Sequence, residues 1–230
     1  MASKLMTIDQ LCNLLRDAGT KGVDAYEKKL RDNENDPLRL EDLACEGYVA
    51  LAFAKYGWSI TIRKTSPDLE GRLNGIFLGI EVKHFRYKPS HDPVEDAALA
   101  SSEAEFVLTP SLKATEGNEE SWDQMFRFAK DHAYQYIDGE FNVMFFWSHT
   151  QAHHFGTILT AAHMYDEELE MSSCDAAMKN LSAMMMNAVW GHHGSIILEV
   201  IAHAKKPLTR ELWELLDQIR EPYNDFRDAR

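Results

Sequence analysis

The chain has 230 residues, of which 45% are hydrophobic and 27% are charged, and its net charge is −13. This composition is ordinary for a globular protein with a full core in one domain, and the acidity argues against a uniformly basic surface for nucleic acid. The sequence shows no apolar run of membrane-spanning length, no uninterrupted apolar signal segment, and no zinc-ligand spacing among three isolated cysteines. We therefore expect a protein without a membrane partner in a reducing compartment, the cytoplasm or the nucleus.

The first part of the chain indicates helices followed by a linker. Helices are predicted over 7–17 and 23–31, separated by two glycines, and the polar run 32–37 is typical of a linker. We therefore divide the chain into an N-terminal helical extension, residues 1–35, and a main domain, residues 36–230.

A further helix is predicted over 39–56, because apolar residues recur at helical spacing and Gly57 supplies a common C-terminal stop. The stripe consists of Leu43, Glu46, Val49, Ala50 and Phe53. Glu46 is therefore an ionisable residue on an inward-facing surface, where a carboxylate is costly unless it pairs with a cation or with hydrogen-bond donors. Either a metal ion removes that cost, or Glu46 lies at the edge of the stripe and reaches water, or it pairs with an arginine.

Three strands are expected next, at 58–64, 68–72 and 76–86. The last two form a hairpin that turns at Asn74-Gly75, because this dipeptide readily adopts the positive φ values of a tight two-residue turn. The two ends of the hairpin therefore lie side by side.

The hairpin places Asp68 beside the strand that contains Glu81-Val82-Lys83. Residues two apart on a strand point to the same face, so Glu81 and Lys83 share one face while Val82 points to the opposite, buried side. Two acids and a lysine at this spacing can form a compact cation-binding site that acts on phosphodiesters. The alternatives are that Glu81 and Lys83 are alternating charges on an exposed sheet face, and that Asp68 after Pro67 is a turn residue.

Charge is unevenly distributed around this pattern. The segment 63–88 holds six basic and three acidic residues, a local charge of +3 in an acidic chain. The six basic residues are Arg63, Lys64, Arg72, Lys83, Arg86 and Lys88. Residues 92–120, by contrast, hold eight acids and one base, and the segment 87–120 is expected to be a long, partly helical insertion or flexible loop whose acidic part covers or flanks the site.

Helices and strands are also expected in the remainder of the chain. A helix over 121–137 precedes an apolar strand over 141–148, and a C-terminal elaboration follows over 149–230. Its predicted elements are a strand near 155–161, a helix around 173–190 with Met184 to Met186 on a packed face, a strand at 195–202 and a helix over 209–219 capped by Thr209. Ten histidines occur, but no Cys/His spacing matches a zinc module, and we do not expect them to be metal ligands.

The motifs Pro67-Asp68 and Glu81-Val82-Lys83, with the helical Glu46 and the segment Gly57-Trp58-Ser59-Ile60, together resemble the PD-(D/E)xK nuclease superfamily, which has the restriction-endonuclease-like fold. The similarity covers about residues 39–148, where the predicted helix, strand, hairpin, helix and strand match the αβββαβ core of the superfamily. The resemblance implies an α/β protein with a mixed central sheet, to which the N-terminal helices and the C-terminal α/β elements are additions.

The resemblance also implies a metal-dependent nuclease, with DNA favoured over RNA as the substrate. Asp68 and Glu81 would coordinate Mg²⁺ or Mn²⁺ together with the backbone carbonyl of Val82, and Glu46 would be a further ligand, direct or through water. Lys83 would orient or help to deprotonate the attacking water and offset negative charge in the transition state. Contacts to the phosphate backbone are expected from Arg63, Lys64, Arg72, Arg86 and Lys88.

Two other functions fit the same residues. The fold can serve as a scaffold in a non-enzymatic protein that binds nucleic acid or protein, and the basic residues would then form a solvated face. Alternatively, the nuclease is a module of a homodimer or a larger assembly, with residues 1–35 or 150–230 docking a partner. Some branches of the superfamily have a glutamine and an aromatic residue on the helix after the hairpin, for which Gln124 with Phe128, or Gln135, are the candidates.

Overall fold

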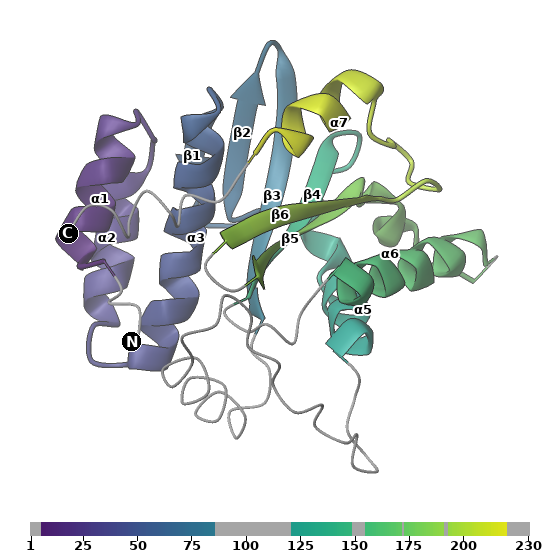
Figure 1. Ribbon diagram of the computed structural model, residues 1–230, viewed down its shortest axis with the longest axis horizontal. Coiled ribbons are helices and arrows are strands. Elements are labelled where there is room, and N and C mark those ends of the chain that lie inside the picture. Colours follow the sequence, from purple (N-terminus) through teal and green to yellow (C-terminus); the bar gives the residue numbers. More distant parts are fainter. Residues whose placement is uncertain (1–5, 86–120, 149–154, 172, 191–192, 220–230) are drawn as a thin grey trace.

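The computed structural model describes residues 6–85, 121–148, 155–171, 173–190 and 193–219 (Figure 1). These residues form α-helices, short 3-10 helices (η) and one six-stranded sheet. In chain order the elements are α1 (Ile8–Asp17), α2 (Val23–Asp32), α3 (Pro37–Lys55), β1 (Ser59–Ile62), β2 (Leu69–Leu73), β3 (Ile76–Phe85), α5 (Ser121–Asp131), η1 (Ala133–Gln135), β4 (Phe141–Ser148), α6 (Phe155–Glu170), η2 (Ala176–Asn180), β5 (Ala183–Trp190), β6 (His193–Val200) and α7 (Arg210–Asp217). None of the helices in the described ranges is long and apolar enough to cross a membrane.

The sheet is mixed, and its strands follow one another across it in chain order from β1 to β6. β1, β2 and β3 are antiparallel neighbours, as are β5 and β6, whereas β4 runs parallel to both β3 and β5. Parallel neighbours need a crossover connection, and α5 and α6 lie in the two connections that lead into and out of β4. The expected mixed α/β class is therefore confirmed.

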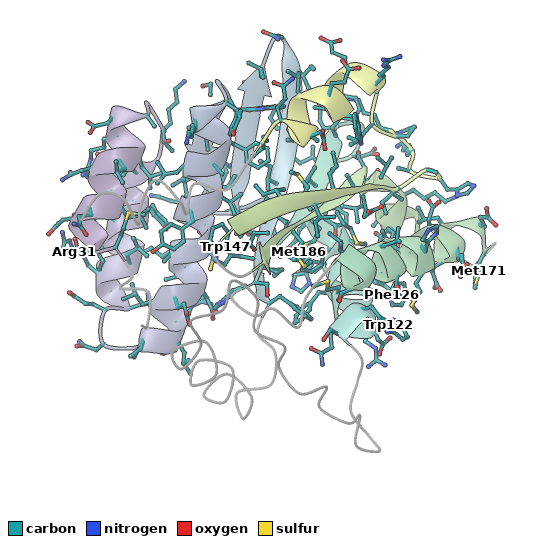
Figure 2. The ribbon with its side chains drawn as sticks, in the orientation of Figure 1. Arg31, Trp122, Phe126, Trp147, Met171 and Met186 are labelled. Atoms are coloured by element: carbon teal, nitrogen blue, oxygen red, sulfur yellow. The ribbon has the colours of Figure 1, made fainter. Side chains whose placement is uncertain are left out.

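Helices cover the sheet on both faces, and the central strands supply side chains to both of the resulting cores (Figure 1). On β4, Phe145 and Trp147 pack with α1, α2 and α3, while Met144 and Phe146 pack with α5 and α6. Trp147 stacks on Tyr48 of α3, with ring centroids 5.4 Å apart. Figure 2 shows Trp147 on the side of α3 and indicates how densely side chains fill both layers. Because β4 is buried on both faces, its sequence is apolar rather than alternating.

The N-terminal helices are joined to α3 by buried polar contacts as well as by apolar packing. The hydroxyl of Tyr26 on α2 donates to the carbonyl oxygen of Leu43 at 2.8 Å and accepts from the N–H of Gly47 at 3.0 Å. A Cβ at position 47 would lie 2.5 Å from that hydroxyl, so a glycine is required there. α2 therefore has a fixed position against the middle of α3, next to Glu46.

The predicted helices and strands up to residue 148 agree with the structure, with boundary differences of a few residues and with the helix over 121–137 ending earlier, at Asp131 before η1. The prediction for residues 155–161 was a strand and is wrong, because this segment begins α6. Its buried hydrophobic residues are Ile158, Ala161, Ala162, Tyr165 and Leu169. Their spacing of three and four is that of one helix face, and it outweighs the β-branched composition at the start of the segment.

The prediction of a helix around 173–190 is also wrong, because the segment contains η2 and the strand β5. Met185 belongs to the core under α3, while Met184 and Met186 belong to the core under α5 and α6. This alternation is the period of two of a strand that is buried on both faces, not a helix face. The strand β6 and the helix α7 are confirmed, and the Oγ1 of Thr209 accepts from the N–H of Leu212 at 3.2 Å as the N-cap.

Candidate functional site

The β2–β3 hairpin positions the acidic pair, as the sequence predicted. Its two strands pair from Leu69 opposite Ile80 to the turn at Asn74-Gly75, where both residues have positive φ, 51° and 80°. Asp68 directly precedes β2 and so lies opposite Glu81 on β3. The backbone N–H of Val82 donates to Oδ2 of Asp68 at 2.9 Å, which fixes the aspartate against β3.

Glu81 is the centre of the site, and it is almost fully buried, with 2% of its surface exposed. Its carboxyl lies within hydrogen-bonding distance of the Asp68 carboxyl, and its Oε1 is 2.8 Å from Nζ of Lys83. Burial, and secondarily the negative charge of Asp68, raise the pKa of Glu81 to about 7, against the lowering effect of Lys83. The structure therefore brings Asp68, Glu81 and Lys83 together, with Glu81 and Lys83 on one face of the strand.

Glu46 lies in the buried stripe of α3, and its partner is a lysine from α2. The Nζ of Lys29 is 2.9 Å from Oε1 and 3.1 Å from Oε2 of Glu46. Burial, and after it the charge of Asp68, raise the pKa of Glu46 to about 7, while Lys29 and Arg39 act in the opposite direction. Glu46 is thus within electrostatic reach of Asp68, but it neither reaches water at the edge of the stripe nor has an arginine as its hydrogen-bonded partner.

The acidic residues of the site, Asp68 and Glu81, have the chemistry of ligands for a divalent metal ion. Across the described ranges, no three His, Cys, Asp or Glu side chains lie close enough to hold a metal ion. Asp68 and Glu81, however, place a half-buried and a buried carboxyl side by side, and a bound cation would offset their mutual repulsion in addition to Lys83. Mg²⁺ is typically held by one or two carboxylates together with waters and substrate phosphate. The pair therefore fits a two-carboxylate Mg²⁺ site, and the roles of Glu46 and of the Val82 carbonyl stay predictions.

Gln135, on η1, is a further residue in contact with Glu81. In the orientation that satisfies both ends of its amide, Nε2 donates to Oε1 and Oε2 of Glu81 at 2.5 and 3.2 Å. The amide oxygen then accepts from Oγ of Ser66 at 3.3 Å and from the hydroxyl of Tyr134 at 3.2 Å. Of the two glutamines that the sequence offered, Gln135 is therefore the one in contact with the acidic pair.

The predicted phosphate-contacting residues separate into two places. Arg63 and Lys64 line a pocket of about 240 Å³ beside α2, together with Gly22, Ala25, Tyr26, Lys29 and Ile62. Arg63 also pairs with Glu70 on β2. Arg72 lies four residues along β2 from Asp68, about 13 Å away, and its guanidinium is over the ring of Phe77 at 4.7 Å. Arg86, Lys88 and the acidic segment 87–120 lie outside the described residues.

Lys29 is a residue of the site that the sequence interpretation missed. It lies three residues after the buried Tyr26 and one before the buried Leu30, at the edge of the inner face of α2. This position beside the buried face of α2 was the only feature of the local sequence that could have pointed to a role for Lys29, because its partner is 17 residues away on another helix.

Comparison with known proteins provides no template for this arrangement: no protein-family model, no curated protein and no solved structure matches the chain.

Proposed function

We propose that this chain is a divalent-metal-dependent nuclease that hydrolyses phosphodiester bonds in DNA, as its resemblance to the PD-(D/E)xK superfamily implies. The observation that carries the proposal is the contact of the Asp68 and Glu81 carboxyls, with Lys83 bound to Glu81 on the same face. The order α3, β1, β2, β3, α5, β4 supports it, because the restriction-endonuclease-like core has the same succession of helices and strands.

The reaction adds water across the phosphodiester. The water oxygen forms a bond to phosphorus and loses a proton to solvent, one phosphorus–oxygen bond to a sugar breaks, and the departing sugar oxygen takes up a proton from solvent to become a hydroxyl. Asp68 and Glu81 would hold the Mg²⁺ or Mn²⁺, with Glu46 acting through water and Val82 through its carbonyl. When bound, the ion supplies Lewis-acid stabilisation of the phosphate charge and lowers the pKa of water.

The protein groups orient the carboxyls and the water. The N–H of Val82 holds Asp68, and the amide of Gln135 holds Glu81 from the side of η1. The ammonium group of Lys83 lies 2.8 Å from Oε1 of Glu81, where it orients the attacking water and offsets the negative charge that builds on the phosphate. This division of roles makes Lys83 important for the rate and the acids important for metal binding.

The basic pocket next to the site supplies contacts to the substrate strand. Lys29, Arg63 and Lys64 are three cations on one small concave surface beside α2, and Lys29 connects this surface to Glu46. Local positive charge of this kind attracts the phosphate backbone even when the whole protein is acidic.

The decisive experiment is a cleavage assay on the full chain with labelled single- and double-stranded DNA and RNA, in Mg²⁺, in Mn²⁺ and in EDTA. We expect cleavage of DNA that needs the metal and that Asp68→Asn, Glu81→Gln and Lys83→Ala each abolish. Glu214→Gln, an exposed change on α7, is the matched control and should cut as the wild type does. Cleavage that persists in EDTA and in all three variants would contradict the proposal.

A non-enzymatic binding protein with the same fold is the second candidate. The Lys29–Glu46 ion pair favours it, because this pair already compensates the charge of Glu46 without a metal ion. Binding of DNA with no metal-dependent cleavage of any substrate would select this function.

A further inference from the structure

A series of aromatic rings extends from the core to the surface beside the acidic pair. It begins at Phe85 on β3, continues through Phe128 on α5 and His132, and ends at Tyr134 on η1, with successive ring centroids 6.0, 6.1 and 6.3 Å apart. Phe85 is 2% exposed, Phe128 is 39% exposed and Tyr134 is 75% exposed. The rings of His132 and Tyr134 are nearly parallel, with an interplanar angle of 24°.

Local hydrogen bonds hold these rings in place. The Nδ1 of His132 is 2.8 Å from the carbonyl oxygen of Phe128, and the N–H of Gln135 donates to the carbonyl oxygen of His132 at 2.9 Å. The outer rings are therefore presented by a short, bonded turn between α5 and β4. A flat surface that is fixed before binding loses little conformational entropy when a ligand stacks on it.

The ring series is continuous with the site. The hydroxyl of Tyr134 bonds to the amide of Gln135, which in turn contacts Glu81. Burial and, after it, the positive charge of Lys83 lower the pKa of His132, so this imidazole lies within electrostatic reach of the lysine. A strand whose phosphate lies at Lys83 would thus have its neighbouring bases next to these rings.

We infer that Phe128, His132 and Tyr134 form a stacking surface for unpaired bases of a DNA strand next to the scissile phosphate. The inference rests on the proposed nuclease function and specifies its substrate as single-stranded DNA. Every base has a π face that can stack on an aromatic side chain, and only unpaired bases present that face, because duplex bases are stacked on one another. The rings therefore distinguish single-stranded DNA from duplex DNA, but they do not distinguish one base sequence from another.

Binding is tested with Asp68→Asn as the background, so that the strand stays intact while Lys83 is kept, in the presence of Mg²⁺. Anisotropy is measured with a labelled 15-nucleotide DNA and with the matched duplex, and a second strand carries 2-aminopurine. Tyr134→Leu should weaken single-strand binding by about 5- to 100-fold, the range for the loss of one base–aromatic stack, and should change duplex binding by less than about twofold. Tyr134→Trp should retain the affinity, and quenching of 2-aminopurine should be lost only in Tyr134→Leu.

The control variant is Trp213→Leu on α7, which removes an exposed aromatic residue outside the ring series and should leave all affinities unchanged. Thermal melting should be the same for Tyr134→Leu and its parent, because the ring is exposed. If Tyr134→Leu leaves single-strand affinity and quenching unchanged while the wild type still cuts DNA with metal, the inference is overturned and the nuclease proposal stands. An equal loss of affinity for strand and duplex also overturns it. Absence of metal-dependent cleavage by the wild type counts against the proposed function instead.

Discussion

Lys29 on α2 bonds both carboxylate oxygens of Glu46 on α3, at 2.9 and 3.1 Å, and so compensates a buried acid that lies within reach of Asp68. The contact depends on the close approach of the two helices at Tyr26 and Gly47. An N-terminal helix outside the resemblance to the nuclease core is thus part of the site.

Replacing Lys29 by methionine should destabilise the protein at pH 7.5. The change leaves Glu46 buried without its cation, and loss of one partner from a buried pair costs about 3–5 kcal/mol when both groups are inaccessible to water. Because the Lys29 side chain is 40% exposed and Glu46 can bind a proton instead, we expect a loss of about 1–2 kcal/mol in the free energy of unfolding. Urea denaturation of the wild type and the variant measures this loss of stability.

Lys28→Met is the matched control for this change, since Lys28 is the exposed neighbour on the same helix. Its effect should stay within about 0.5 kcal/mol of the wild type. The double variant Lys29→Met/Glu46→Gln should recover most of the loss. Equal destabilisation by both lysine variants would show that the pair contributes nothing specific.

The metal-free protein should become less stable as the pH rises from about 4.5 to about 7. Glu46 and Glu81 each have a pKa of about 7 in the folded chain, against an ordinary value of 4.5, chiefly because burial disfavours the charged form. The folded chain therefore binds more protons than the unfolded chain in this window, so the free energy of unfolding falls with rising pH and levels off above it. Each carboxyl contributes on the order of 3 kcal/mol to this fall in the free energy of unfolding.

Urea denaturation in EDTA, from pH 4.5 to pH 8, measures this dependence as a difference between variants. The fall should be smaller in Glu46→Gln and in Glu81→Gln than in the wild type, whereas Glu214→Gln should follow the wild type. An unchanged pH profile in both glutamine variants of the site would refute the assignment of the two raised pKa values.

Mg²⁺ should stabilise the folded chain through the Asp68–Glu81 pair, because a ligand that binds only the folded state raises its stability by mass action. At a concentration 100 times the dissociation constant the gain is about 2.7 kcal/mol, which corresponds to a rise in Tm of about 5–10 °C for a chain of this size. Thermal melting with and without Mg²⁺ at pH 7.5 measures the rise. Asp68→Asn should lose it and Glu214→Gln should keep it; an identical rise in Asp68→Asn would place the ion elsewhere.

The sequence is sufficient to predict the part of the site that is local in the chain. Asp68, Glu81 and Lys83 lie within sixteen residues and on one hairpin, so the Asn74-Gly75 turn and the period of two are enough to bring them together. The apolar stripe of α3 places Glu46 on an inward-facing surface but leaves open whether its carboxylate reaches water; the structure shows that it is buried. For the hairpin residues, the pattern is enough to predict the geometry without reference to distant residues.

The remaining parts depend on packing that no local pattern encodes. Lys29 meets Glu46 only because the hydroxyl of Tyr26 fits over Gly47 on another helix, and Gln135 meets Glu81 only because α5 ends before η1. The segments on either side of η2 were assigned wrongly for a related reason. β5 is apolar on both faces because the sheet has a helical layer on each side, and this environment removes the alternation that identifies a strand.

Gln135→Ala should reduce DNA cleavage while leaving the fold intact. The amide of Gln135 donates to both oxygens of Glu81 and so orients a carboxylate that is proposed to hold the metal ion. Groups in this supporting position typically contribute 10- to 100-fold to metal affinity or activity. Cleavage rates measured across an Mg²⁺ titration should therefore show a higher metal requirement, a lower maximal rate, or both, by about that factor. Gln124→Ala, on α5, is the control that removes the other candidate glutamine and should leave both quantities unchanged; the same loss in the two variants would remove Gln135 from the site.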